Sequence, residues 1–156
     1  MNYKKTQIGW TAIGLFISII SLLFLSYMFQ WGNPPTFNEF VTYSIIFLII
    51  ILLFYKLTIK LSDSALKVIF GIGIIRFNIQ IDKLIDVRVI KTPWYYGIGI
   101  RITSEGMLYN IRWGHAVEIK YISKGKSKTV MVGSANPLEL KNVLESYPLI
   151  NKSPLK

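Results

Sequence analysis

The sequence predicts a membrane-spanning α-helical hairpin followed by a mainly-β domain that ends in one α-helix. Two long apolar stretches lie within residues 1–55. From residue 56 onward apolar and polar residues alternate with a period of two, which is typical of half-buried strands. Near the C-terminus a capping pattern precedes apolar residues at helical spacing. We therefore expect a hairpin over residues 1–55, a β domain over residues 56–147 and a tail over residues 148–156.

The composition narrows the class of protein. Hydrophobic residues make up 52% of the 156 residues, charged residues make up 17%, and the mean hydropathy is +0.44. These values exclude a disordered chain, a fibrous repeat and an ordinary water-soluble enzyme. The net charge of +10 predicts anionic partners. There is no Cys and one His, which excludes a disulfide framework and a thiol nucleophile, and we expect no metal and no cofactor.

The first apolar stretch runs from Ile8 to Phe29 without a charged residue. At about 1.5 Å per residue it reaches roughly 33 Å, enough to cross the hydrocarbon core of a bilayer. The second runs from Phe40 to Tyr55 and reaches about 24 Å, which its apolar neighbours can extend. A signal peptide is the alternative for the first stretch, but no small residues stand at its exit for cleavage. A buried core helix is the alternative for the second.

The basic residues predict the orientation of the hairpin. Lys4 and Lys5 precede the first span, and Lys56 and Lys60 follow the second. The connection Gln30–Glu39 contains neither Lys nor Arg. The positive-inside rule therefore places both termini in the cytoplasm, and we expect a multi-pass protein of the inner (cell) membrane.

Alternation predicts strands around the segments 57–61, 75–81, 85–89, 98–102, 117–121 and 130–132. The short turns between them predict an antiparallel meander that closes into a barrel or sandwich. A final helix is predicted from Asn136 as cap, Pro137 at the first position and Glu139 as the capping-box residue. Its apolar face, formed by Leu140, Val143, Leu144 and Tyr147, would cover one end of the barrel.

Several short motifs carry a family resemblance. They are Phe70-Gly71-Ile72-Gly73, the run Trp94 to Arg101, Gly106 to Asn110, Ala116 to Ile119, Gly125-Lys126 and Val132-Gly133. Together with the preceding hairpin and the final helix, they resemble the small bacterial membrane proteins with a pleckstrin-homology-like (PH-like) domain. The likeness covers about residues 56–147. It implies a PH-like barrel or sandwich and brings no catalytic residues and no cofactor.

The motifs that could carry catalysis are weak. The Gly pairs 71/73 and 97/99 lack the third Gly of a phosphate-binding loop and indicate bulges or close backbone approach. Asp82 and Asp86 would share a face if a helical turn stood there, but no partner nucleophile is near. His115 alone does not make a metal site.

The remaining signal is a basic hairpin, formed by Lys120, Lys124, Lys126 and Lys128. These four lysines are the candidate surface for anionic lipid or a protein partner, since each basic residue near an anionic membrane adds roughly 1 kcal/mol of attraction. The alternative is that these lysines only set the membrane topology and keep the domain soluble. We do not expect nucleic acid as a partner. Trp94, Tyr95, Tyr96 and Trp113 could stack on bases, but they can equally be core or interface residues.

The sequence thus predicts a membrane-anchored, non-enzymatic module that binds a protein partner or anionic lipid headgroups at the cytoplasmic membrane surface. A small membrane-embedded lipid-modifying enzyme is one alternative. An accessory subunit of a transporter or of a toxin-resistance system is the other.

Overall fold

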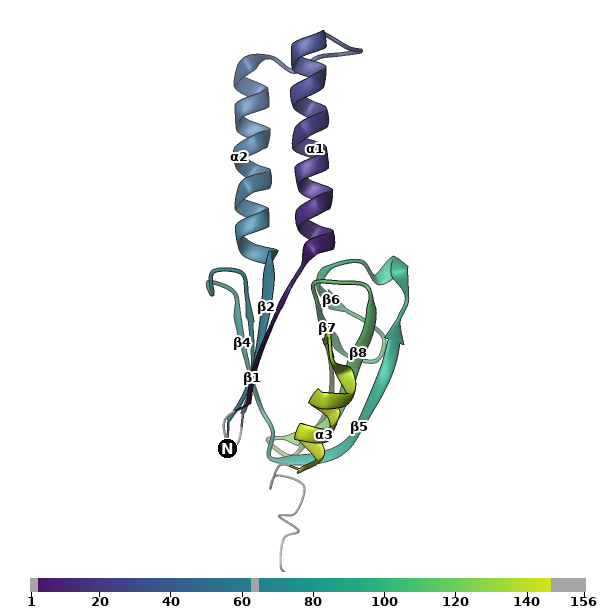
Figure 1. The fold of residues 1–156 in the computed structure, drawn as a ribbon. Helices are drawn as coiled ribbons and strands as arrows, with labels where there is room; N and C mark the ends of the chain where they lie inside the picture. The colour runs from purple at the N-terminus through teal and green to yellow at the C-terminus, as the bar shows by residue number, and fades with distance from the viewer. Residues whose placement is uncertain (1–2, 63–64, 147–156) are drawn as a thin grey trace, which may run out of the picture.

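The computed structural model describes residues 3–62 and 65–146. Its elements in chain order are β1 (Tyr3–Ile8), α1 (Trp10–Phe29), α2 (Phe37–Phe54), β2 (Lys56–Ser62), β3 (Ala65–Phe70), β4 (Arg76–Gln80), β5 (Lys83–Thr92), the 3₁₀ turn η1 (Trp94–Tyr96), β6 (Gly99–Ile102), β7 (Met107–Asn110), β8 (Gly114–Ser123), β9 (Lys126–Gly133) and α3 (Pro137–Ser146). The two long helices project together from one end of the β-rich part (Figure 1).

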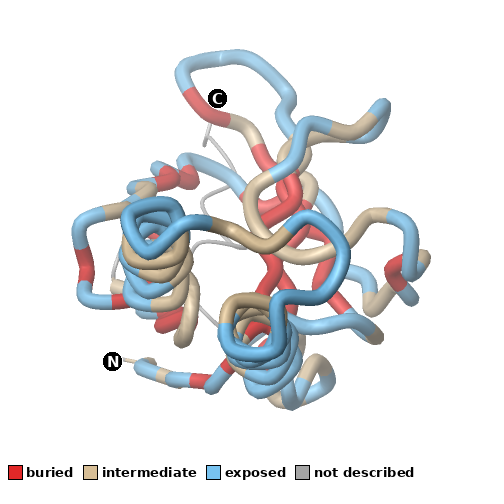
Figure 2. The backbone as a smooth tube through the Cα atoms, turned by 90° about the horizontal axis from the view of Figure 1, so that it is seen from above, coloured by how far each residue is buried: buried red, intermediate tan, exposed pale blue. Residues whose placement is uncertain are grey.

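The two helices α1 and α2 are each long and apolar enough to cross a membrane. Within them only Ala12 is buried, and Figure 2 shows both helices exposed around most of their circumference. A core helix of a soluble domain would be buried, so this alternative for the second stretch is wrong. Thr36 caps α2, since its side chain accepts the Glu39 amide and its own amide donates to the Glu39 carboxylate. Tyr27 stacks on Phe40 across the pair, with 5.7 Å between ring centroids.

Strand β1 was not predicted from the sequence. Residues 3–8, assigned there to the hairpin region, pair antiparallel with β2, from Tyr3 opposite Leu61 to Ile8 opposite Lys56. The first helix accordingly begins at Trp10 and not at Ile8, and the β-rich part includes residues from both sides of the hairpin. The physical reason for the miss is that β1 turns polar side chains inward, so no apolar alternation marks it.

The inward side chains of β1 reach the C-terminal part of the chain. Lys5 Nζ donates to Glu139 Oε2 of α3 at 2.8 Å, and Gln7 Nε2 donates to the Gly133 carbonyl. The bond from Lys5 is the main cause that lowers the pKa of Glu139. Burial, and after it the nearby Glu139 charge, raise the pKa of Tyr3 to about 12. The first strand and the last helix therefore hold each other in place.

The strands form two open sheets, with orders β1-β2-β3-β4 and β5-β8-β9-β7-β6. The predicted antiparallel meander is wrong for the described strands, because β7 and β9 pair in parallel and the second sheet does not follow sequence order. Of the predicted barrel or sandwich, the described strands do not form a closed barrel, since both sheets are open. The alternation was read correctly but does not encode which strands pair. The turn expected after the strand at 57–61 falls partly on residues 63–64, which lie outside the described residues.

The core lies between the two sheets and is completed by α3. Leu140 and Leu144 of α3 are buried in it, with Val143 packed beside them, which confirms the predicted apolar face for these three positions. Helix α3 packs on β5 and β8. Tyr147 and the tail 148–156 lie outside the described residues.

The sheet and the helical hairpin are joined without a linker. The strand β1 leads through Gly9 into α1, and α2 leads through Tyr55 into β2, with the Gly9 amide bonded to the Tyr55 carbonyl at 2.8 Å. The β3–β4 turn contacts the end of α2. The Gly71 amide donates a hydrogen bond to the Lys56 carbonyl, and the Ile72 amide donates one to the Leu52 carbonyl. Orphan carbonyls at a helix end are thereby satisfied. The helices α1 and α2 and the first sheet thus form one continuous unit.

This junction makes Gly71 a sensitive position. A Cβ at Gly71 would lie 2.1 Å from the Leu52 carbonyl oxygen, and its φ is +51°. Gly125 has a φ of +74° with open space around it, so Gly125→Ala carries only the backbone cost of about 1–2 kcal/mol. We expect Gly71→Ala to lower the thermal unfolding temperature of the full chain in detergent clearly more than Gly125→Ala does. Equal losses would show that the turn does not rest on α2.

Candidate functional site

The basic hairpin lies at the end of the β-rich part that is remote from α1 and α2. Strand β8 begins at Gly114, beside Trp113, which packs near the base of α1, and ends at Ser123 just before the turn. At about 3.3 Å per residue, that strand carries the turn roughly 30 Å away from the helices. Lys124 and Gly125 both have positive φ, as a tight two-residue hairpin turn requires.

The four lysines of the basic hairpin do not form one cluster with one role. Lys124, Lys126 and Lys128 are exposed around the turn, and the Lys124 amide donates to Asp82 Oδ2 at 2.7 Å. Lys120 instead lies within β8, before the turn, and its Nζ is 3.6 Å from Glu118 Oε1. Glu118 is almost fully buried and also accepts from Arg88 at 2.9 Å. Lys120 therefore belongs to an ion-pair network on the outer face of the second sheet.

The end next to the helices carries exposed apolar side chains whose position together was not predicted from the sequence. Its side chains come from the start of α1, the β3–β4 turn, η1 and the β7–β8 connection, and their exposed fractions are 72% for Trp10, 54% for Ile72, 70% for Ile74, 78% for Trp94, 62% for Tyr95 and 51% for Trp113. Large exposed apolar side chains at one end of a domain are typical of a site that interacts with a membrane, a protein or a ligand.

Cations stand among these apolar side chains at the same end. They are Lys56 at the start of β2, Arg76 at the start of β4, Lys91 near the end of β5, Arg101 on β6 and Arg112 before β8. The Arg76 Nε donates to the Gly73 carbonyl of the β3–β4 turn, and the Arg101 guanidinium lies beside the Gly97 backbone. Lys91, Arg101 and Arg112 are exposed. We name these five cations and six apolar residues together the helix-proximal surface.

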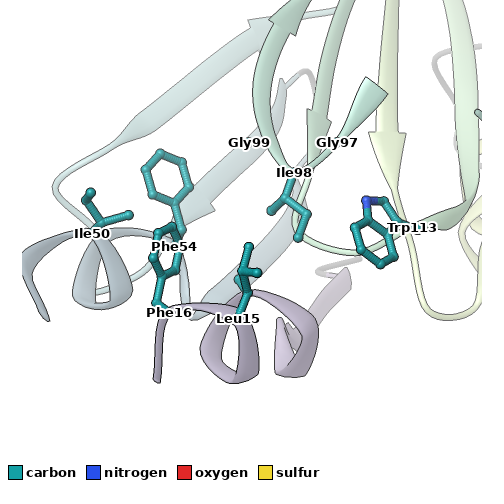
Figure 3. Close-up of a pocket in the computed structure, with 9 residues that line it drawn as sticks. Leu15, Phe16, Ile50, Phe54, Gly97, Ile98, Gly99 and Trp113 are labelled. Carbon is teal, nitrogen blue, oxygen red and sulfur yellow. The ribbon is translucent and has the colours of Figure 1, made fainter. Parts of the chain in front are cut away.

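An apolar cleft of about 300 Å³ opens within this surface, between the bases of α1 and α2 and the segment before β6 (Figure 3). Leu15 of α1 and Phe54 of α2 line one side, and Ile98 and Trp113 the other. The flanking glycines, Gly97 and Gly99, both have positive φ, a backbone conformation that favours glycine. Two further hollows border Trp113, one lined by Arg112 and one by Lys91. None of the three is lined by a described Asp or Glu.

The residues considered for catalysis are dispersed. Asp82 binds the Lys124 amide, and Asp86, which stands on a strand and not in a helical turn, pairs with Arg88 at 3.0 Å. His115 is exposed on β8. Within residues 3–62 and 65–146 no three His, Cys, Asp or Glu lie close enough to hold a metal ion. At Gly71 the predicted close backbone approach is confirmed.

The alternation of strand direction is the signal that could have revealed the helix-proximal surface. Each strand that leaves the helices is followed by one that returns, so every second connection comes back to the same end. Recognising β3 and β7 as strands would have placed Ile72, Trp94 and Trp113 together.

No protein-family model, no curated protein and no solved structure matches this chain.

Proposed function

We propose that this chain is a two-span protein of the inner membrane whose β-rich part is a non-enzymatic module that binds anionic lipid headgroups at the cytoplasmic surface. The observation that carries the proposal is the helix-proximal surface, where five cations and six exposed apolar side chains surround the point from which both helices emerge. Its PH-like relationship is part of the same proposal, supported by two sheets that share a core with a C-terminal helix.

The chemistry of this surface suits a membrane interface. Trp and Tyr side chains are favoured at the headgroup level, because their rings are amphipathic. Each Lys or Arg close to an anionic leaflet adds about 1 kcal/mol of attraction. The spans themselves hold the surface at this level, so no separate binding energy is needed to bring it there. The module would therefore sample the lipids around its own anchor.

The distance of the basic hairpin argues for a different role of its exposed lysines. A separation of roughly 30 Å greatly exceeds the Debye length of about 8 Å at physiological ionic strength. Lys124, Lys126 and Lys128 are thus too far from the bilayer for a strong attraction. The sequence analysis also allowed a protein partner. Binding of an acidic soluble protein is the better proposal for Lys124, Lys126 and Lys128.

The alternatives differ in features that can be tested. A lipid-modifying enzyme would need ionisable side chains at membrane depth, and α1 contains no Asp, Glu, Lys or Arg, while Glu39 of α2 serves the helix cap. An accessory subunit would co-purify with a larger membrane complex.

The proposed function makes a prediction about membrane topology. Lys4, Lys5, Lys56 and Lys60 flank the spans on one side, so both termini should be cytoplasmic. Alkaline phosphatase, which is active only outside the cytoplasm, should therefore stay inactive when fused after Lys156 and become active when inserted after Asn33. The reverse pattern would overturn the proposed orientation.

The second prediction concerns lipid binding. A ligand that binds the folded state raises its stability, so the full chain in phosphatidylcholine nanodiscs should unfold at a higher temperature when phosphatidylglycerol is added. The combined change Lys91→Gln, Arg101→Gln and Arg112→Gln should remove most of that rise in unfolding temperature. At low salt the three cations together would contribute up to about 3 kcal/mol to the stabilisation by phosphatidylglycerol. Thermal unfolding followed by circular dichroism measures it.

The matched control changes the same number of cations at the other end. Lys124→Ser, Lys126→Ser and Lys128→Ser should leave the phosphatidylglycerol effect almost intact. If this control abolishes the effect and the first variant retains it, the lipid site lies at the basic hairpin and the helix-proximal assignment is wrong.

A further inference from the structure

The apolar cleft lies at the depth where acyl chains begin, if the helices cross the bilayer as proposed. Leu15 stands five residues beyond the start of α1, about 8 Å along the helix axis. Ile50 lies at a similar height on α2, four residues before its end. Segment 97–99 therefore reaches beside the first two turns of α1 and the last two turns of α2, and it leaves a space there that neither helix fills.

The lining of the cleft selects an apolar occupant. Ala12, Leu15, Phe16, Ile50, Phe54 and Ile98 contribute hydrocarbon surface. In Figure 3 Leu15 and Ile98 point toward each other across it, with Trp113 at its side. A volume of about 300 Å³ is at the lower end of the range for small-molecule sites. It suits a flexible hydrocarbon chain better than a bulky rigid ring system.

A cationic hollow adjoins the cleft and shares the wall made by Trp113. Arg112, Trp10 and Thr11 line this hollow, which lies by the first turn of α1. The Arg112 guanidinium can bind a phosphate with two parallel hydrogen bonds, and the Trp113 indole N–H and the Thr11 hydroxyl are further donors. An apolar cleft beside an arginine, without a described acid between them, is complementary to an anionic amphiphile.

We infer that this composite site binds one phospholipid of the surrounding bilayer, with an acyl chain in the cleft and the phosphate at Arg112. The inference rests on the proposed function and deepens it, because it turns a surface that attracts anionic lipids in general into a site for one lipid molecule. That lipid bridges α1, α2 and the second sheet, which otherwise meet only loosely at this point.

To test the inference, a larger side chain is placed in the cleft, and its effect on lipid binding is compared with that of the same substitution elsewhere on α1. Leu15 is 54% exposed, so Leu15→Phe adds bulk at the cleft without disturbing a buried position. Leu22→Phe is the control, because Leu22 is 64% exposed and lies two turns farther along the same face. Native mass spectrometry of the full chain released from phosphatidylcholine–phosphatidylglycerol nanodiscs counts the phospholipids that stay bound.

The wild-type chain and Leu22→Phe should retain one phosphatidylglycerol, whereas Leu15→Phe and Arg112→Gln should lose it. A second readout is the quenching of Trp113 by phosphatidylglycerol with brominated chains, in a variant in which the other three Trp residues are changed to Phe. Quenching should exceed the share of brominated lipid in the bilayer and fall to that share with Leu15→Phe.

Three outcomes would overturn this inference, and they differ in what they mean for the proposed function. A chain that is stabilised by phosphatidylglycerol but retains no phospholipid, with Trp113 quenched only in proportion to the brominated fraction, overturns the lipid site and leaves the proposed function standing. A chain that alkaline carbonate removes from membranes overturns both. Retention of a second protein copy in place of lipid would show that the cleft is a protein interface, which also overturns the inference.

Discussion

The direct continuation of two paired strands into two long helices is the constraint on which the rest of the structure depends. Strands β1 and β2 are hydrogen-bonded along their length, and the bond from the Gly9 amide to the Tyr55 carbonyl extends that pairing to the helix bases. The β3–β4 turn then seats Gly71 against the last turn of α2. Because no flexible segment intervenes, the direction of the helices fixes which end of the sheets lies next to them.

This constraint separates two groups of exposed cations that have different surroundings. Five cations and the exposed aromatic side chains stay beside the helices, while the lysines of the β8–β9 turn stay at the opposite end. The contacts from Lys5 to Glu139 and from Gln7 to Gly133 tie the N-terminal strand to α3 and β9, so the second sheet keeps its place relative to the first. The electrostatics of the chain therefore follow from its backbone path.

Local sequence patterns predicted the helices, most strands and the buried face of α3, because each depends on the period of apolar residues within one segment. They did not predict β1, whose inward residues Lys5 and Gln7 are polar, nor the parallel pairing of β7 with β9, which depends on contacts distant in sequence. Lys124, Lys126 and Lys128 were correctly placed at or beside a turn, whereas Lys120 lies within β8. Their position relative to the helices could not be read from the turn itself, since it depends on how many strands precede it.

The central claim is that the helix-proximal surface lies at the bilayer and the basic hairpin does not. The sequence contains no Cys, so a single introduced Cys gives one label site. Ile74→Cys and Ser127→Cys, each carrying a small fluorophore in the full chain in phosphatidylcholine–phosphatidylglycerol vesicles, should respond oppositely to quenchers. The label at position 74 should be quenched by spin-labelled lipid, and the label at position 127 by aqueous iodide alone. Lipid quenching at position 127 together with iodide quenching at position 74 would contradict the account.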